Sequence, residues 1–183
     1  ELSHQECKIK TIYIGGGTPS SLDSKYIVDI LNIIKQKRNL ENTEVTIEVN
    51  PGTVTKEKLL DYKLSGINRL SIGLQETNNN LLKQIGRIHN YEEFIETYNI
   101  AREVGFKNIN VDLMIGLPNQ SIQEIKESLN KVITLNPEHI SVYSLILEEG
   151  TKLYEKYQNK DLELPDEELE RNMYWYVKNT LEN

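Results

Sequence analysis

Four short segments of this chain place glycine, carboxylate or amide groups directly after a run of strand-forming residues. Glycine backbone can bind polar atoms of a ligand at close range, and carboxylates can hold cationic groups or hydrogen-bond donors. In α/β proteins such groups build the ligand site at the carboxyl ends of the strands. The pattern therefore predicts one ligand site made from several strands. The segments are Thr11–Gly17, Glu44–Gly52, Arg69–Gln75 and Asn110–Pro118.

The first segment ends in a glycine-rich loop, Gly15-Gly16-Gly17, followed by Thr18. These glycines would let a ligand reach the amide and carbonyl groups of the backbone. The spacing is that of neither a dinucleotide fingerprint nor a phosphate-binding loop, since no lysine follows. A tight turn without a ligand is the alternative interpretation.

Three polar side chains, Glu48, Gln75 and Asp112, hold equivalent positions at the ends of three consecutive strands. A carboxylate that points into the interior of a barrel needs a cationic partner or hydrogen-bond donors, so a structural ion pair is the alternative for Glu48. Arg87 follows a short predicted helix and, taken alone, fits a solvated surface arginine better than a ligand residue.

Strands and helices alternate along the chain, which predicts a parallel sheet with right-handed crossovers. The last helix is expected to begin at Pro165. The predicted strands are Thr11–Gly16, Val45–Val49, Leu70–Leu74, Ile109–Ile115 and Ile140–Leu147. The predicted helices before it are Leu22–Arg38, Thr55–Leu64, Asn80–Ile85, Tyr91–Val104 and Ser121–Leu135.

The faces of the strands distinguish a barrel from a doubly wound sheet. In the second strand Val45, Ile47 and Val49 share one face, and Thr46 and Glu48 share the other. A doubly wound sheet buries both faces under helices, and its strands are nearly continuous apolar runs. The alternation instead predicts a barrel-like sheet with helices outside and a ligand inside. Since a complete eight-stranded barrel takes roughly 250 residues, we predict a partial (β/α) barrel with its strands in sequential order.

The composition bounds the protein class. With 183 residues and 38% hydrophobic content the chain can form one sizeable core. We expect residues 1–164 to be the barrel core and residues 165–183 to be a helix that leads toward a carboxyl-terminal domain. The chain begins with Glu1 rather than Met, so we expect a piece of a longer protein. A net charge of −7 argues against non-specific binding of nucleic acid.

No metal site is predicted. His4, His89 and His139 lie far apart in the sequence and lack the spacing of metal ligands. Cys7 is the single cysteine, which suits a reducing, cytoplasmic environment. No apolar run approaches the ~20 residues that a membrane span needs, and no signal peptide opens the chain.

Four motifs, in order across nearly the whole chain, resemble the radical S-adenosylmethionine proteins related to oxygen-independent coproporphyrinogen III oxidase. The segment Ser141–Leu145, continuing to Glu149–Tyr154, resembles the haem-chaperone branch of that family more than the oxidase. The four motifs are Tyr13–Ser20, Glu48–Thr53, Gly73–Gln75 and Asp112–Pro118.

The resemblance implies a site for S-adenosylmethionine. Gly16, Gly17 and Thr18 would present backbone groups to the methionyl end of that ligand. Glu48 would face its ammonium or neighbouring polar groups. Arg87 would pair with its carboxylate, for which the guanidinium fork is well shaped.

The same resemblance assigns the nucleoside end. Gln75 and Asp112 would take the two ribose hydroxyls, and Ile146, on the last predicted strand, would pack against the nucleoside.

The chain departs from the family at the cluster. Such proteins hold a [4Fe–4S] cluster with three cysteines in a C-x-x-x-C-x-x-C loop, whereas this chain has Cys7 alone. We therefore expect no metal ligands in this chain, and the chain as it stands should be unable to reduce S-adenosylmethionine.

Three functions remain open. The resemblance favours a haem chaperone that binds haem and S-adenosylmethionine and passes haem to acceptor proteins, with membrane contact by the intact protein left open. The first alternative is an oxidase that decarboxylates coproporphyrinogen propionates through a 5′-deoxyadenosyl radical. The second is a barrel fragment that acts only as a scaffold.

Overall fold

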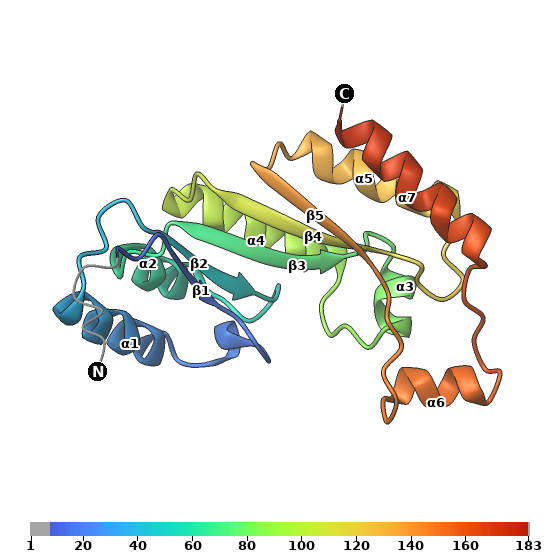
Figure 1. Ribbon diagram of the computed structural model, residues 1–183, viewed down its shortest axis with the longest axis horizontal. Coiled ribbons are helices and arrows are strands. Elements are labelled where there is room, and N and C mark those ends of the chain that lie inside the picture. Colours follow the sequence, from blue (N-terminus) through green and yellow to red (C-terminus); the bar gives the residue numbers. More distant parts are fainter. Residues whose placement is uncertain (1–7, 183) are drawn as a thin grey trace. The chain divides into compact units, whose positions relative to one another are not determined.

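The computed structural model describes residues 8–182, whose five strands form one sheet in the order β1-β2-β3-β4-β5 (Figure 1). The pairs β1–β2 and β2–β3 are parallel, with Ile12 opposite Val45 and Ile47 opposite Leu70. A sequential order means that each crossover moves one strand along the sheet, as in a (β/α) barrel, so the predicted order is confirmed. The strands are β1 Thr11–Ile14, β2 Glu44–Val49, β3 Arg69–Gln75, β4 Ile109–Ile115 and β5 His139–Ser144.

Helices connect the strands, and polar residues fix where most of them begin. Ser121 forms a capping box with Glu124 at the start of α5, because each side chain binds the backbone N–H of the other residue. A short 3₁₀ turn, Pro19–Ser21, precedes α1. The helices are α1 Ser24–Lys37, α2 Lys56–Leu64, α3 Asn79–Gln84, α4 Tyr91–Val104, α5 Ile122–Thr134, α6 Lys152–Gln158 and α7 Glu167–Leu181. No helix in residues 8–182 is long and apolar enough to cross a bilayer.

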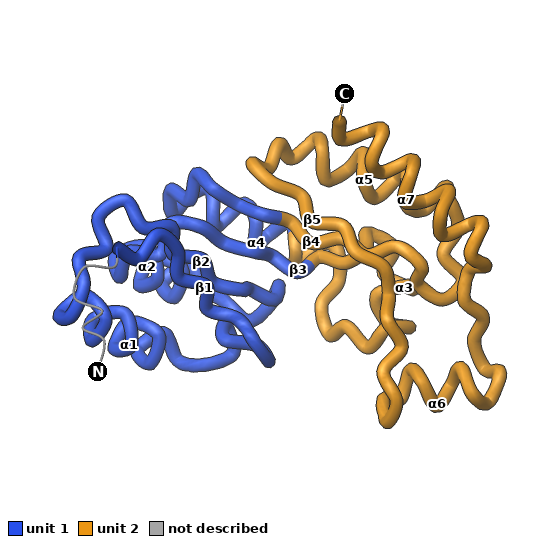
Figure 2. Tube along the Cα trace, in the orientation of Figure 1, with its two compact units in different colours: residues 1–73, 95–110 blue, residues 74–94, 111–183 orange. Residues whose placement is uncertain are grey.

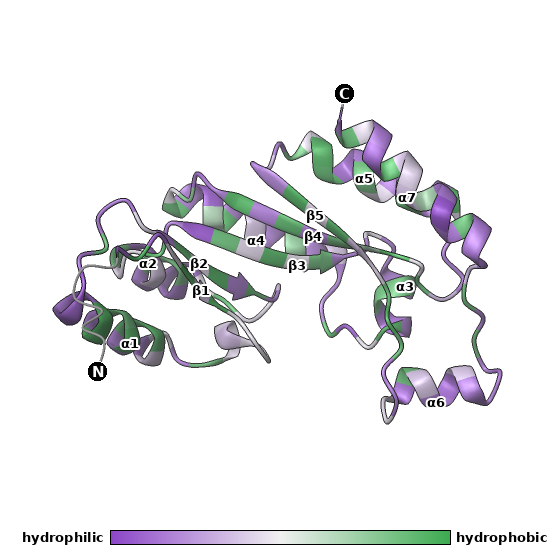
Figure 3. Cartoon of the chain, viewed as in Figure 1, coloured by the Kyte–Doolittle hydropathy of each residue, from purple (hydrophilic) through white to green (hydrophobic). Residues whose placement is uncertain are grey.

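The alternation read from the sequence predicts the buried apolar face, but the other face is only partly exposed, because Thr46 on β2 and Asn110 on β4 are buried as well. On β2 the side chains of Val45, Ile47 and Val49 are buried, while Glu48 is half-exposed. On β4, Val111 and Leu113 are buried and Asp112 between them is half-exposed. Apolar and polar residues accordingly alternate along β4 (Figure 3). The apolar residues of these strands therefore form the core, as predicted.

The chain divides into two compact units (Figure 2). Unit 1 comprises residues 1–73 and 95–110, and unit 2 comprises residues 74–94 and 111–183. In unit 1, α1 packs beside α2 and buries Ile27. In unit 2, α5 packs against α7 and both bury apolar side chains, among them Val132, Met173 and Val177.

Four predicted boundaries differ from the structure by two or more residues, among them the start of α1, which is Ser24 rather than Leu22. The strand β1 ends at Ile14, and the backbone then turns through Gly16, whose φ is +110°. The strand β5 ends at Ser144 rather than Leu147, and α6, which the sequence analysis did not predict, follows it. The last helix begins at Glu167 rather than Pro165, because the Asp166 carboxylate accepts a hydrogen bond from the backbone N–H of Leu169 and caps the helix.

Tyr62 on α2 is fully buried in unit 1, and its hydroxyl has no hydrogen-bond partner among the described residues. Burial raises the pKa of Tyr62 from 10.0 to about 12, and the carboxylates of Asp23 and Asp61 add to the shift. The buried phenol therefore costs desolvation without a compensating hydrogen bond.

We expect Tyr62→Phe to be at least as stable as the wild type at pH 7, because the substitution removes an unsatisfied donor. The folded state favours the neutral phenol of Tyr62 over its ionised form. The stability that depends on this preference is fully present below pH 10.0 and is lost as pH rises through about 12. The wild type should therefore lose about 2 kcal/mol more than the variant over that range. Urea denaturation at both pH extremes measures the difference, with Tyr26→Phe on the exposed side of α1 as the control. A variant much less stable than the wild type at pH 7 would show that the hydroxyl has a partner.

Candidate functional site

In unit 1 the end of β2 is joined to the end of β1 by a pair of side chains. The Tyr13 hydroxyl donates a hydrogen bond of 3.0 Å to Oε1 of Glu48. Within residues 8–182 no cation lies within 4.0 Å of Glu48, so the structural ion pair considered for this residue is not formed there. The carboxylate is instead satisfied in part by a neutral donor.

The three glycines after β1 have three different environments. A Cβ on Gly15 would lie 2.8 Å from both Oε1 of Glu48 and the Tyr13 ring, so a side chain there would have to displace the ends of these two side chains. Gly16 has a φ of +110°, which favours glycine. A Cβ on Gly17 would meet nothing within 4 Å, and its φ is not in the left-handed region. Residues 8–182 therefore give no steric reason for glycine at position 17, and a ligand that approaches the backbone would supply one.

The loop that follows is tied to the end of β2. The amide of Asn50 donates to the Thr18 hydroxyl at 3.2 Å, and the Thr18 hydroxyl donates to the Gly17 carbonyl at 2.6 Å. The buried Ser20 hydroxyl accepts hydrogen bonds from the Asn50 backbone N–H and the Thr53 hydroxyl. These bonds hold Gly17 and Thr18 beside the strand end.

In unit 2 the structure brings Gln75 together with a residue that the sequence analysis did not single out. Gln75 is the last residue of β3, is only 3% exposed, and has a φ of +73° although it is not glycine. The Tyr143 hydroxyl, on β5, donates to Oε1 of Gln75 at 2.8 Å. The polar-face alternation used for the earlier strands, applied to β5, would have found Tyr143.

Arg87 and Asp112 belong to the same cluster of unit 2. Arg87 is half-buried, not a solvated surface residue. Burial lowers the pKa of its guanidinium, and the nearby Tyr143 and Asp112 oppose that shift. The structure thus gathers an amide, a cation, a carboxylate and a phenol, which can bind hydroxyl and carboxylate groups.

Two other residues of unit 2, Ile146 and His89, lie in opposite environments. Ile146 lies beyond the end of β5 and is 79% exposed, so its predicted place on the strand is wrong. His89 is buried, and its Nε2 lies 3.2 Å from the Leu74 carbonyl oxygen. Burial lowers the pKa of His89, which makes the neutral ring with the proton on Nε2 the form that fits this contact. His4 and Cys7 lie outside the described residues.

Glu76, directly after Gln75, is the most consequential residue that the sequence analysis missed. It is fully buried. Its Oε1 accepts hydrogen bonds from the backbone N–H groups of Thr77 (2.6 Å) and Asn78 (3.2 Å) and from the Ser128 hydroxyl on α5. Its Oε2 accepts from Nε2 of Gln120 at 2.7 Å. A charged residue at a strand end was visible in the sequence, but these partners are not.

Gln120 carries the connection to β4. Its side chain also donates to the Met114 carbonyl and accepts from the Leu117 backbone N–H, both at 3.2 Å. Glu76 and Gln120 therefore join the end of β3, which carries Gln75, to the strand that carries Asp112.

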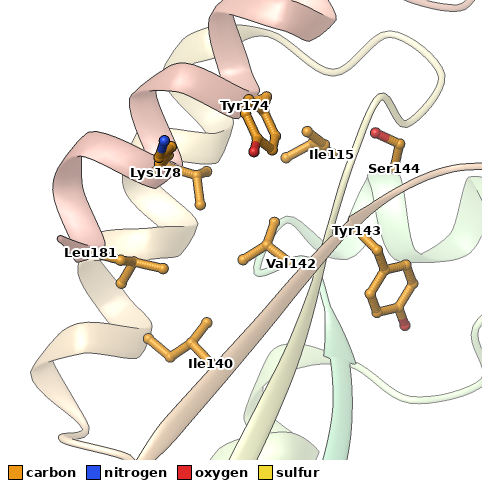
Figure 4. A pocket seen from close by; sticks show the side chains of 9 residues that line it. Ile115, Ile140, Val142, Tyr143, Ser144, Tyr174, Lys178 and Leu181 are labelled. Carbon is orange, nitrogen blue, oxygen red and sulfur yellow. The ribbon is translucent and has the colours of Figure 1, made fainter.

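A cavity of about 380 Å³ lies elsewhere in unit 2, between β5 and α7. Ile140, Val142 and Leu181 line it, and the Tyr143 ring points to the opposite side of β5 (Figure 4). The lining also includes Tyr143, Ser144 and Lys178, but none of the predicted ligand residues.

Sequence comparison assigns the family. The model of the radical SAM superfamily matches residues 1–132. The chain therefore belongs to the radical SAM superfamily, and its partial (β/α) barrel is the fold expected of that family.

Two heme chaperones and one solved structure of this superfamily are similar to the chain. It is 41% identical to the heme chaperone HemW of Bacillus subtilis, over 95% of this chain and 46% of that protein. It is also 41% identical to HemW of Haemophilus influenzae, over 91% of this chain and 43% of that protein. The structure of the coproporphyrinogen III oxidase HemN from Escherichia coli matches with a TM-score of 0.81 and 26% identity, over 95% of this chain and 40% of that one. The chain thus spans less than half the length of these relatives.

The superfamily implies S-adenosylmethionine and a [4Fe–4S] cluster as its cofactors. The residues of this chain fit the first and not the second. Gln75, Arg87 and Asp112 offer groups that suit a ribose and a carboxylate. A cluster needs several cysteine ligands, and the chain contains Cys7 alone.

We expect Glu76→Ala to lower the free energy of unfolding by about 3 kcal/mol, because four donors, three of them on buried residues, lose the acceptor that Glu76 provides. Glu76→Gln, which keeps one acceptor oxygen, should lose less. Chemical denaturation measures both, and Glu127→Ala, an exposed residue of α5, is the matched control. Equal losses for Glu76→Ala and the control would show that the network adds no stability.

Proposed function

We propose that the polar cluster of unit 2 binds S-adenosylmethionine. The observation that carries this proposal is the grouping of Gln75, at the end of β3, with Asp112 on β4, Arg87 after α3 and Tyr143 on β5. The carboxylate of Asp112 and the amide of Gln75 would bind the ribose hydroxyls. Arg87 would bind the carboxylate of the ligand, because its half-buried guanidinium gains from an anionic partner.

For unit 1, taken by itself, we propose that the backbone of Gly16, Gly17 and Thr18 can bind polar groups of a ligand, and the open space above Gly17 supports this role. Glu48 would face a cationic group of such a ligand, and the absence of a cationic partner within the described part of the chain is compatible with it.

We further propose that the whole protein handles haem as a chaperone and delivers it to acceptor proteins. The support is the 41% identity to two proteins named heme chaperone HemW, over more than nine-tenths of this chain. Decarboxylation of coproporphyrinogen is the alternative, supported by the structural match to HemN at 26% identity. A scaffold without a ligand does not account for the clustered polar groups.

The 183-residue chain should bind S-adenosylmethionine only weakly, because one cysteine cannot hold the cluster that chelates the methionyl group. We expect a millimolar dissociation constant, about 4 kcal/mol or less. Calorimetry or NMR titration measures it, and Asp112→Ala should abolish the binding while Asp161→Ala, an exposed control, leaves it unchanged. Micromolar affinity that persists in Asp112→Ala would place the ligand elsewhere.

The haem proposal is tested with the protein encoded by the full reading frame. A chaperone should bind haem, seen as a shift of the Soret band on titration, and release it to an apo-haemoprotein. It should not decarboxylate coproporphyrinogen III when its cluster is reconstituted and reduced. Release of carbon dioxide from that substrate, with no haem transfer, would favour the oxidase.

A further inference from the structure

The ring of Tyr143 lies on the other side of β5 from the apolar side chains of that strand (Figure 4). Its neighbours Val142 and Ile140 face the cavity under α7, while the Tyr143 ring points to the opposite side of β5 (Figure 4). From there its hydroxyl reaches Gln75, a residue 68 positions earlier in the chain, at 2.8 Å.

The direction of this hydrogen bond follows from the two atoms that it joins. A phenol can donate its proton or accept one, whereas the carbonyl oxygen of a carboxamide can only accept. The Tyr143 hydroxyl is therefore the donor and Oε1 of Gln75 the acceptor, as the structure has it.

This arrangement decides which end of the Gln75 carboxamide meets a ligand. A carboxamide has an acceptor end and a donor end, and rotation by half a turn exchanges them. Within residues 8–182, the Tyr143 hydroxyl is the one side-chain group that hydrogen-bonds to the Gln75 carboxamide. With Oε1 held by Tyr143, the amide presents its NH₂ group, whereas the Asp112 carboxylate can only accept.

We propose that Tyr143 is a positioning residue that fixes Gln75 as a hydrogen-bond donor, so that Gln75 and Asp112 together select a ligand with a vicinal diol. One hydroxyl of the diol accepts from Nε2 of Gln75, and the other donates to Asp112. A ribose has this pair of hydroxyls, and a deoxyribose lacks one of them. The proposal rests on the proposed S-adenosylmethionine site and names the group that orients it.

The test uses the 183-residue chain and three nucleosides: adenosine, 2′-deoxyadenosine and 3′-deoxyadenosine. Dissociation constants are measured by NMR titration for the wild type, Tyr143→Phe, Gln75→Ala and the double variant. Tyr157→Phe is the control, since Tyr157 on α6 has the same 43% exposure as Tyr143. Thermal melting of each variant checks that it is folded.

Tyr143→Phe should raise the dissociation constant for adenosine by about three- to tenfold, which is the effect of losing one hydrogen bond. It should leave unchanged the binding of the one deoxynucleoside that lacks the hydroxyl facing Gln75. In Gln75→Ala the added Tyr143→Phe should have no effect, and Tyr157→Phe should match the wild type.

The contrary outcomes are distinct. If Asp112→Ala weakens adenosine and Tyr143→Phe does not, the positioning role is wrong and the site stands. If Tyr143→Phe weakens the binding of all three nucleosides equally, the Tyr143 hydroxyl supports the structure of the site as a whole. It then does not act through one hydroxyl of the ligand, and the positioning role is wrong. If the wild type binds no adenosine, or Asp112→Ala has no effect on that binding, the proposed site fails and the positioning role fails with it.

Discussion

A buried carboxylate, for which residues 8–182 offer no cation within 4.0 Å, determines how the strand ends of unit 2 are held. Charged oxygen atoms in an apolar interior are unstable unless hydrogen-bond donors surround them. Glu76 collects four donors, from two backbone N–H groups, from Ser128 on α5 and from Gln120 after β4. Because the donors come from the segment after β3, from the segment after β4 and from α5, satisfying one charge also fixes the places of these segments. Gln75, whose φ is positive, directly precedes Glu76.

The carboxylate of Glu48 in unit 1 follows the same rule. It accepts from the Tyr13 hydroxyl and has no cation within 4.0 Å in the part of the chain that the structure describes. Neutral donors satisfy hydrogen-bonding capacity without cancelling charge, so each carboxylate keeps its negative potential. S-adenosylmethionine carries an ammonium and a sulfonium, and a negative potential at the strand ends would favour such a ligand. Arg87 differs from these carboxylates because its side chain is positively charged. Its proposed partner is the carboxylate of S-adenosylmethionine, the one anionic group of that ligand.

The sequence was informative wherever short-range chemistry decides structure. The alternation of apolar and polar residues in β2 and β4 follows from the geometry of a strand, so the fold and the buried faces could be predicted. The start of the last helix was predicted at Pro165, from the preference of proline for the first turn, but the Asp166 cap sets it at Glu167. The end of β5 was missed because no glycine or proline follows Ser144 directly.

The residues that orient the site were harder to predict. The contact between Tyr143 and Gln75 joins residues 68 positions apart, and that between Ser128 and Glu76 joins residues 52 positions apart. No local pattern specifies such pairs, because the topology of the sheet brings them together. The alternation along β5 could have pointed to Tyr143, but the partners of Tyr143 and Glu76 were found only in the structure.

The three glycines after β1 would respond differently to selection for folding and selection for ligand binding. At Gly16 a larger residue strains the backbone, so this position should be constrained in every assay that requires a folded protein. At Gly15 a larger residue meets the ends of the Glu48 and Tyr13 side chains, which can move, so the constraint there should be weaker. At Gly17 a side chain would enter open space, and a library selected for folding alone should accept substitutions there. Mutational tolerance at a single position, compared between the two selections, would thus separate the part of this loop that serves the fold from the part that serves a ligand.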